Sequence, residues 1–268
     1  MRHSIVKTGM ILALTCTAFR VYPESGPQIW SIPIPRFTED IKKGETDFLT
    51  SMDPALLDPS HVKNLGPGGG LYLSYIFEKL KKQEEAVLML ETEITNRKAA
   101  GDESGGIFLR EAAYRLLALQ TAKKSAEDLE RAEALVVAAV EDRRVFYLLA
   151  EGYFRLKRDK DAIRNLDRAV TQRFGILSAE EAARSEFLRA AAGARLGLPG
   201  WDRLYLGLFT SQPSSAIIGE AYEFLGREKI SLSPFDADEQ GFLRARYDTY
   251  KQEYHKAQTS FSKLIAKR

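Results

Sequence analysis

The chain has 268 residues, of which 44% are apolar and 28% are charged. This is an ordinary composition for a globular protein with a sizeable buried core, and it excludes a wholly disordered chain. The formal net charge of +2 is too small to attract nucleic acid or an anionic membrane surface, so neither is expected as a partner.

Residues 1–18 are typical of a signal peptide. Arg2 and Lys7 give a positive start, and the apolar stretch over residues 9–19 is too short to span a bilayer comfortably. Cys16 and the small residues around it offer a cleavage site. Two alternatives stay open, an acyl anchor on Cys16 and an N-terminal helix retained in a cytosolic protein. We expect export to the periplasm or cell envelope.

The remaining chain divides into a Pro-rich extended arm over residues 19–36 and an all-α solenoid over residues 37–268. Apolar residues from Leu71 onward recur with helical spacing, and no run keeps the period of two that a strand requires. We expect helices near residues 37–50, 71–82, 84–99, 105–122, 125–140, 142–157, 159–173, 178–196, 200–210, 214–228, 235–252 and 254–267.

Several helix ends carry local signals. Ser125 and Ser178 are each followed by acidic residues, and Ser178 with Glu181 has the spacing of a capping box. Residues 197–200 pair a helix-ending glycine with a proline that cannot continue the helix. Ser233-Pro234 predicts a cap followed by proline at the first helical position.

Residues 145–170 specify the size of side chains as well as their polarity. Large and small apolar residues alternate on one face of each of two helices. Ala150 and Ala162 would let the two backbones approach closely while large neighbours fill the gaps on either side. The pattern predicts an antiparallel helical hairpin.

The same positions resemble the tetratricopeptide repeat, a helix–turn–helix unit of 34 residues. The residues that fill the family pattern are Phe146, Leu149, Ala150, Tyr153, Ala162, Leu166 and Ala169. Residues 71–94 match less fully, with Gly70 in place of the leading aromatic and Glu93 in place of the final alanine. Residues 254–265 match the second helix alone. The resemblance implies stacked hairpins that bind proteins and perform no chemistry.

The overall layout of leader, arm and degenerate hairpins is also similar to the superhelical domain of soluble lytic transglycosylases, which cleave peptidoglycan. That family's catalytic Glu-Ser and Gly-Leu-Met-Gln stretches would be needed for activity. Only Glu103-Ser104 lies away from prolines, in a loop without the apolar pocket that would raise a carboxyl pKa. The catalytic domain is therefore expected to be absent.

No other pattern points to chemistry. The glycine-rich residues 66–70 lack the Lys-Ser/Thr of a phosphate cradle and predict a flexible helix-entry loop. His3, His61 and His255 are scattered, and no Cys or His cluster could hold zinc. We expect no catalytic residue, cofactor or metal.

The expected binding site is the concave face of the hairpin at residues 145–170. The residues predicted to point into it are Arg144, Tyr147, Glu151, Phe154 and Arg155. The alternative is that they only cover the adjacent hairpin. Glu151 would repel a terminal carboxylate, which disfavours the binding of chaperone tails.

The sequence therefore predicts an exported, non-catalytic scaffold that binds a protein or peptide in the bacterial envelope. Two other functions stay open. One is a truncated or accessory module of a peptidoglycan lytic transglycosylase, with peptidoglycan as its partner. The other is a purely structural oligomerisation module.

Overall fold

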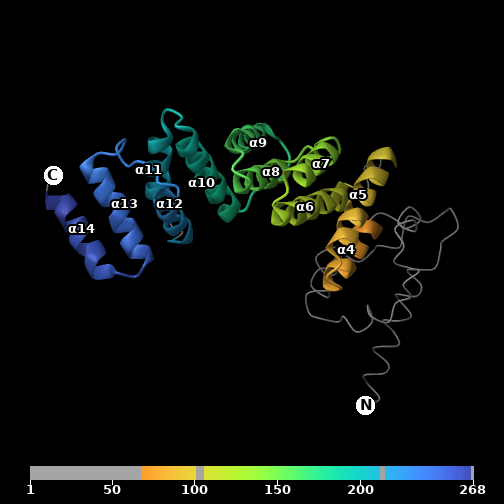
Figure 1. Ribbon diagram of the computed structural model, residues 1–268, viewed down its shortest axis with the longest axis horizontal. Helices are drawn as coiled ribbons and strands as arrows, with labels where there is room; N and C mark the ends of the chain where they lie inside the picture. Colours follow the sequence, from red (N-terminus) through yellow and green to blue (C-terminus); the bar gives the residue numbers. More distant parts are fainter. Residues whose placement is uncertain (1–67, 101–105, 212–214, 267–268) are drawn as a thin grey trace, which may run out of the picture. The chain divides into compact units, whose positions relative to one another are not determined.

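The computed structural model describes residues 68–100, 106–211 and 215–266, and this part of the chain is all-α, with eleven helices and no strand (Figure 1). The leader, the Pro-rich arm, Glu103 and the helix expected over residues 37–50 lie outside it. The helices are α4 (Gly69–Lys79), α5 (Gln83–Ala100), α6 (Gly106–Lys123), α7 (Ala126–Val137), α8 (Arg143–Arg155), α9 (Asp159–Thr171), α10 (Ala179–Leu196), α11 (Trp201–Ser211), α12 (Ser215–Arg227), α13 (Ala237–Tyr250) and α14 (Tyr254–Ala266).

The described residues form two compact units. Unit 1 holds residues up to 120 together with 130–140, and unit 2 holds residues 121–129 and everything from 141 onward. Unit 1 is built on α4 packed against α5. Unit 2 contains α8 to α14, in which α10 contacts α8, α9, α11 and α12, and α13 contacts α11, α12 and α14.

The N-terminus of α4 in unit 1 is closed by a carboxylate from α5. Glu93 is only 1% exposed, and its two oxygens accept hydrogen bonds from the N–H groups of Gly68 (2.8 Å) and Gly70 (2.9 Å). Arg97 holds the same carboxylate at 3.1 Å. The expectation of a flexible loop at residues 66–70 is wrong for Gly69 and Gly70, which begin α4 because Glu93 caps it.

The hairpin of α8 and α9 in unit 2 buries the side chains that the size pattern singled out. Each of them is at most 3% exposed: Phe146, Leu149, Ala150, Tyr153, Ala162, Leu166 and Ala169. Ala150 and Ala162 are completely buried, and α8 packs along α9. Burial of small residues at a helix contact permits close approach of the two backbones, as the pattern predicts.

Most of the predicted helix caps are present. Ser125 Oγ accepts from the N–H of Asp128 at 3.2 Å, and Ser178 and Glu181 form a complete capping box. Gly197 ends α10 in the left-handed conformation, with φ 64°. The cap expected at residues 233–234 is wrong, because Asp236 caps α13 and its carboxylate accepts from the N–H groups of the second and third helical residues.

The same backbone turn closes five helices. In each, two consecutive N–H groups donate back to carbonyls in the last helical turn, the bond pattern of a Schellman motif. Gly197 is the only glycine at the left-handed position of these turns. The other four positions are Lys81 (φ 60°), Lys157 (φ 59°), Lys229 (φ 54°) and Gln252 (φ 62°). Side chains with a Cβ atom are strained in this conformation.

Candidate functional site

The face predicted for binding is divided by the structure into a buried part and a groove. Phe154 is 6% exposed and packs against the rings of Phe187 on α10 and Phe224 on α12, with centroids 6.1 and 5.8 Å away. It covers the adjacent hairpin, which was the alternative expectation. Its ring is therefore not presented to a partner.

Tyr147 and Glu151 line the groove. Its other lining residues lie on α10 and α12: Glu180, Glu181, Arg184, Ala216, Ile217 and Glu220. The hollow measures about 260 Å³. Burial raises the pKa of Tyr147, and the negative charge of Glu151 raises it further. The phenol is thus held neutral.

The charged residues of this groove satisfy one another. Arg144 pairs with Glu181 at 2.7 Å and Arg155 with Glu151 at 2.7 Å. Arg184 contacts Glu220 directly and lies 3.9 Å from Glu151. Glu151 thus lies between Arg155 and Arg184, and Arg144 forms a pair of its own with Glu181. A partner would have to displace existing pairs to bind there.

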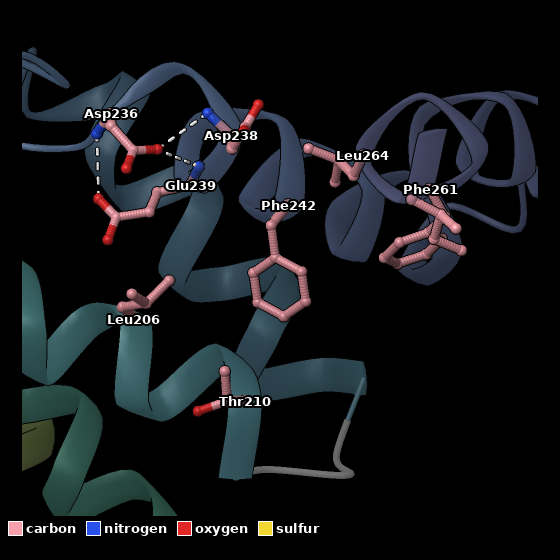
Figure 2. Close-up of a pocket in the computed structure, with 9 residues that line it drawn as sticks. Leu206, Thr210, Asp236, Asp238, Glu239, Phe242, Phe261 and Leu264 are labelled. Carbon is pink, nitrogen blue, oxygen red and sulfur yellow. Dashed lines mark hydrogen bonds between the residues drawn. The ribbon is translucent and has the colours of Figure 1, made fainter. Parts of the chain in front are cut away.

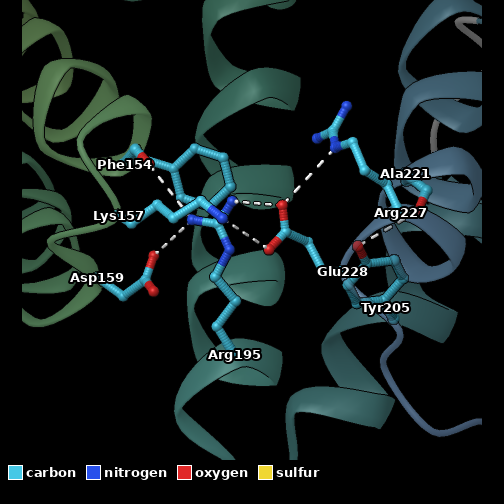
Figure 3. A network of polar contacts seen from close by, with 8 residues as sticks. All are labelled: Phe154, Lys157, Asp159, Arg195, Tyr205, Ala221, Arg227 and Glu228. Carbon is cyan, nitrogen blue, oxygen red and sulfur yellow. Dashed lines mark hydrogen bonds and ion pairs between the residues drawn. The ribbon is translucent and has the colours of Figure 1, made fainter. Parts of the chain in front are cut away.

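A second cluster of charges lies deeper in unit 2, around Arg195 in the last turn of α10 (Figure 3). Its guanidinium donates to the carbonyl of Phe154 (3.3 Å), to Asp159 (3.1 Å) and to Glu228 (3.4 Å). It also lies over the rings of Phe154 and Phe224, 4.4 and 4.8 Å from their centroids. One side chain therefore joins the ends of four helices.

The pKa values of the two carboxylates around Arg195 are shifted in opposite directions. Burial raises the pKa of Asp159, and the nearby Arg195 opposes the shift without cancelling it. Burial also acts on Glu228, but there Arg195 and Lys157 together outweigh it and lower the pKa. Lys157 lies 3.4 Å from Glu228. The contacts of Arg195 and Lys157 with these carboxylates link α8, α9, α10 and α12.

Another hollow lies between α11, α13 and α14 (Figure 2). It measures about 720 Å³ and has an apolar lining with carboxylates at one end. We call it the terminal pocket. Its lining residues are Leu206, Thr210, Asp236, Asp238, Glu239, Phe242, Phe261, Leu264 and Ile265.

Sequence reasoning missed the terminal pocket and the Arg195 cluster. Both assemble from segments far apart in the chain, such as Asp159 and Arg195, 36 residues apart. A signal for Arg195 existed, because it follows a run of alanine and glycine that packs into the core. A single long cation at the end of such a run indicates a specific buried partner.

Comparisons with known proteins identify no relative. No protein-family model, curated protein or solved structure matches the chain. Within the described ranges, no helix has the length and apolar character to cross a membrane, and no group of three His, Cys, Asp or Glu side chains is placed to hold a metal ion.

Proposed function

We propose that this protein is an exported, non-catalytic helical scaffold that binds a protein segment in the bacterial cell envelope, and that its helices form a tetratricopeptide-like solenoid. The terminal pocket is the observation that carries the proposal. Its apolar side chains include Ile265, which is 74% exposed. Apolar surface gathered in a hollow is characteristic of binding sites, whereas single exposed apolar residues are common everywhere.

The hairpin of α8 and α9 supports the solenoid part of the proposal. Its seven pattern positions are buried, and the helices that follow pack on their neighbours in chain order. The leader-like composition of residues 1–18 supports export. The ion-paired groove at Tyr147 and Glu151 is a weaker candidate for the main contact, because its hollow is smaller, about 260 Å³ against about 720 Å³.

Affinity capture from envelope extracts tests the proposal. The full-length chain is compared with two matched variants, Ile265→Ser in the terminal pocket and Ile176→Ser in the connection before α10. Both isoleucines are strongly exposed, at 74% and 89%, so both variants should fold. We expect Ile265→Ser to lose captured proteins that wild type and Ile176→Ser retain. Identical captured sets for all three would contradict a binding role for the pocket.

The other two functions have separate tests. Incubation of the chain with purified peptidoglycan should release no anhydro-sugar products, and their release would overturn the non-catalytic proposal. Size-exclusion chromatography with light scattering addresses oligomerisation. A dimer in wild type that Ile265→Ser dissociates would show that the pocket joins copies of this chain.

A further inference from the structure

The terminal pocket has the shape of a furrow between helices. α13 packs against both α11 and α14, so Phe242 lies on the floor between side chains of the two walls (Figure 2). Leu206 and Thr210 are four residues apart on α11, and Phe261, Leu264 and Ile265 share one face of α14. Furrows lined by two helix faces are the sites that receive amphipathic helices.

Close packing at the floor keeps the furrow shallow on the α14 side. A Cβ atom on Gly241 would meet Leu264 at 3.3 Å, so glycine at this position lets α14 approach α13. The rings of Phe242 and Phe261 then meet edge to face, with centroids 6.4 Å apart. Neither ring is fully buried. Both rings line the furrow together with Leu264 and Ile265.

The charged side chains that line the furrow are acidic and gather at one end. Three carboxylates, those of Asp236, Asp238 and Glu239, stand at one end, and two of them, Asp236 and Glu239, also form the capping box of α13. Glu239 is paired with Arg203 at 2.6 Å, and Arg203 also lies 3.6 Å from Asp202. Lys263, on α14, lines a different hollow with His255 and Ser262. Among the described residues that line the terminal pocket, none carries a positive charge.

We propose that the terminal pocket binds a basic amphipathic helix of a partner protein. The apolar face of that helix lies along Phe242, Phe261 and Leu264, and its lysine or arginine side chains face the carboxylates beside α13. This inference rests on the proposed function and specifies the chemistry of the partner. Complementary charge fixes the direction and specificity of binding, and the apolar contact supplies most of the affinity.

The test uses the full-length chain and three fluorescein-labelled peptides of about 14 residues, long enough for about four helical turns. The first carries Leu and Phe on one helical face and Lys on the other. The second has the same composition in an order that spreads Leu and Phe around the helix. The third replaces every Lys with Glu. Binding is measured by fluorescence anisotropy at low and high salt.

We expect only the first peptide to bind, with an affinity that falls as salt rises. Ile265→Ser should weaken the affinity for the first peptide about fivefold or more, and Ile176→Ser should leave this affinity unchanged. Equal binding of the first two peptides would show unspecific adhesion of a cationic chain and would overturn the proposal. So would preferential binding of the Glu peptide.

A matched pair of charge variants tests whether recognition takes place inside the furrow. Thr210 lines the furrow and Thr259 lies on α14 outside it, and each donates its hydroxyl to a backbone carbonyl of its own helix, at 2.8 and 2.9 Å. Thr210→Lys should weaken the binding of the basic peptide about fivefold, while Thr259→Lys should leave it unchanged. Equal effects of the two variants would contradict recognition within the furrow.

The peptide results and the capture results separate the two proposals. If Ile265→Ser loses envelope proteins but no basic amphipathic peptide binds, the scaffold function stands and the partner chemistry is wrong. If the variant captures everything that wild type captures and no peptide binds, both are wrong.

Discussion

The carboxylate of Glu93 on α5 accepts a hydrogen bond from the backbone N–H of Gly70 on α4, at 2.9 Å. The two residues are also in steric contact, because a Cβ atom on Gly70 would lie 2.7 Å from Cβ of Glu93 and 2.6 Å from the carbonyl oxygen of Met89. Gly70 and Glu93 are the two residues that depart from the tetratricopeptide pattern in this hairpin. They are therefore parts of one arrangement. Glycine at position 70 makes room for the carboxylate that caps α4.

Removal of this cap should destabilise unit 1. Glu93→Ala leaves the N–H groups of Gly68 and Gly70 without their acceptor inside the protein. We expect a loss of about 2 kcal/mol in the free energy of unfolding, and a smaller loss for Glu93→Gln, which keeps an acceptor oxygen. Urea unfolding followed by circular dichroism measures both. Equal stability of wild type and Glu93→Ala would contradict the cap.

Gly70→Ala should be destabilising by about 1–3 kcal/mol, because the added methyl group meets backbone and a buried side chain. In the double variant with Glu93→Gly, which lacks the Cβ atom of Glu93, part of that loss should be recovered, since one of the two obstacles is gone. Simple additivity of the two losses in a double-mutant cycle would show that the residues are not coupled.

A glycine at a strained turn position should stabilise unit 2. Lys229 has φ 54°, in the left-handed region. Lys229→Gly relieves the left-handed strain, and we expect a net gain of about 0.5–1 kcal/mol after the greater chain entropy of the unfolded glycine variant. The matched variant Lys263→Gly, within α14, should lose about 1 kcal/mol instead. Thermal unfolding measures the change in stability of each variant. Changes of the same sign in both variants would contradict the prediction.

Arg195→Met should be among the most damaging single substitutions in unit 2. It leaves Asp159, 7% exposed, without its cation and removes a donor to the carbonyl of Phe154. We expect a loss of about 3–5 kcal/mol, the usual cost of breaking a buried pair. The double variant Arg195→Met/Asp159→Asn should recover part of it. If the double variant is less stable than Arg195→Met, Asp159 is not the residue left uncompensated.

The stability contributed by Asp159 should depend on pH. Its pKa is raised in the folded protein by burial, so the folded state binds the proton more tightly than the unfolded chain, where an aspartate titrates near about 3.9. Its contribution is therefore complete below that pH and is lost as the pH rises through the folded pKa. The measurement is the difference in unfolding free energy between wild type and Asp159→Asn across this interval. As the pH rises, wild type should lose stability relative to Asp159→Asn. A difference in unfolding free energy that stays constant with pH would contradict the raised pKa of Asp159.

The helices could be predicted from the sequence because their signals are local. Apolar periodicity placed all eleven described helices within a few residues of their ends, and the caps at Ser125 and Ser178 follow from spacing alone. Ser233-Pro234 misled because the same stretch contains a stronger signal, Asp236 with Glu239 three residues later.

The candidate site was less accessible to prediction because it depends on packing between hairpins. The burial of Phe154 depends on Phe187 and Phe224, which lie on two later helices. The terminal pocket likewise combines α11 with α14, more than 40 residues downstream. Periodicity identifies which face of a helix is apolar. It does not identify which neighbour covers that face, or whether part of it stays open.

The sparse packing of α14 has a consequence for the order in which unit 2 opens. Ala257 is the only fully buried residue of this helix, whereas Arg195 ties the ends of α8, α9, α10 and α12 together. Amide hydrogens of α14 should thus exchange with deuterium well before those of the four linked helices, which form a separate cooperative block. Occupation of the terminal pocket would slow that exchange in α14 first, so deuterium uptake by this one helix reports binding directly.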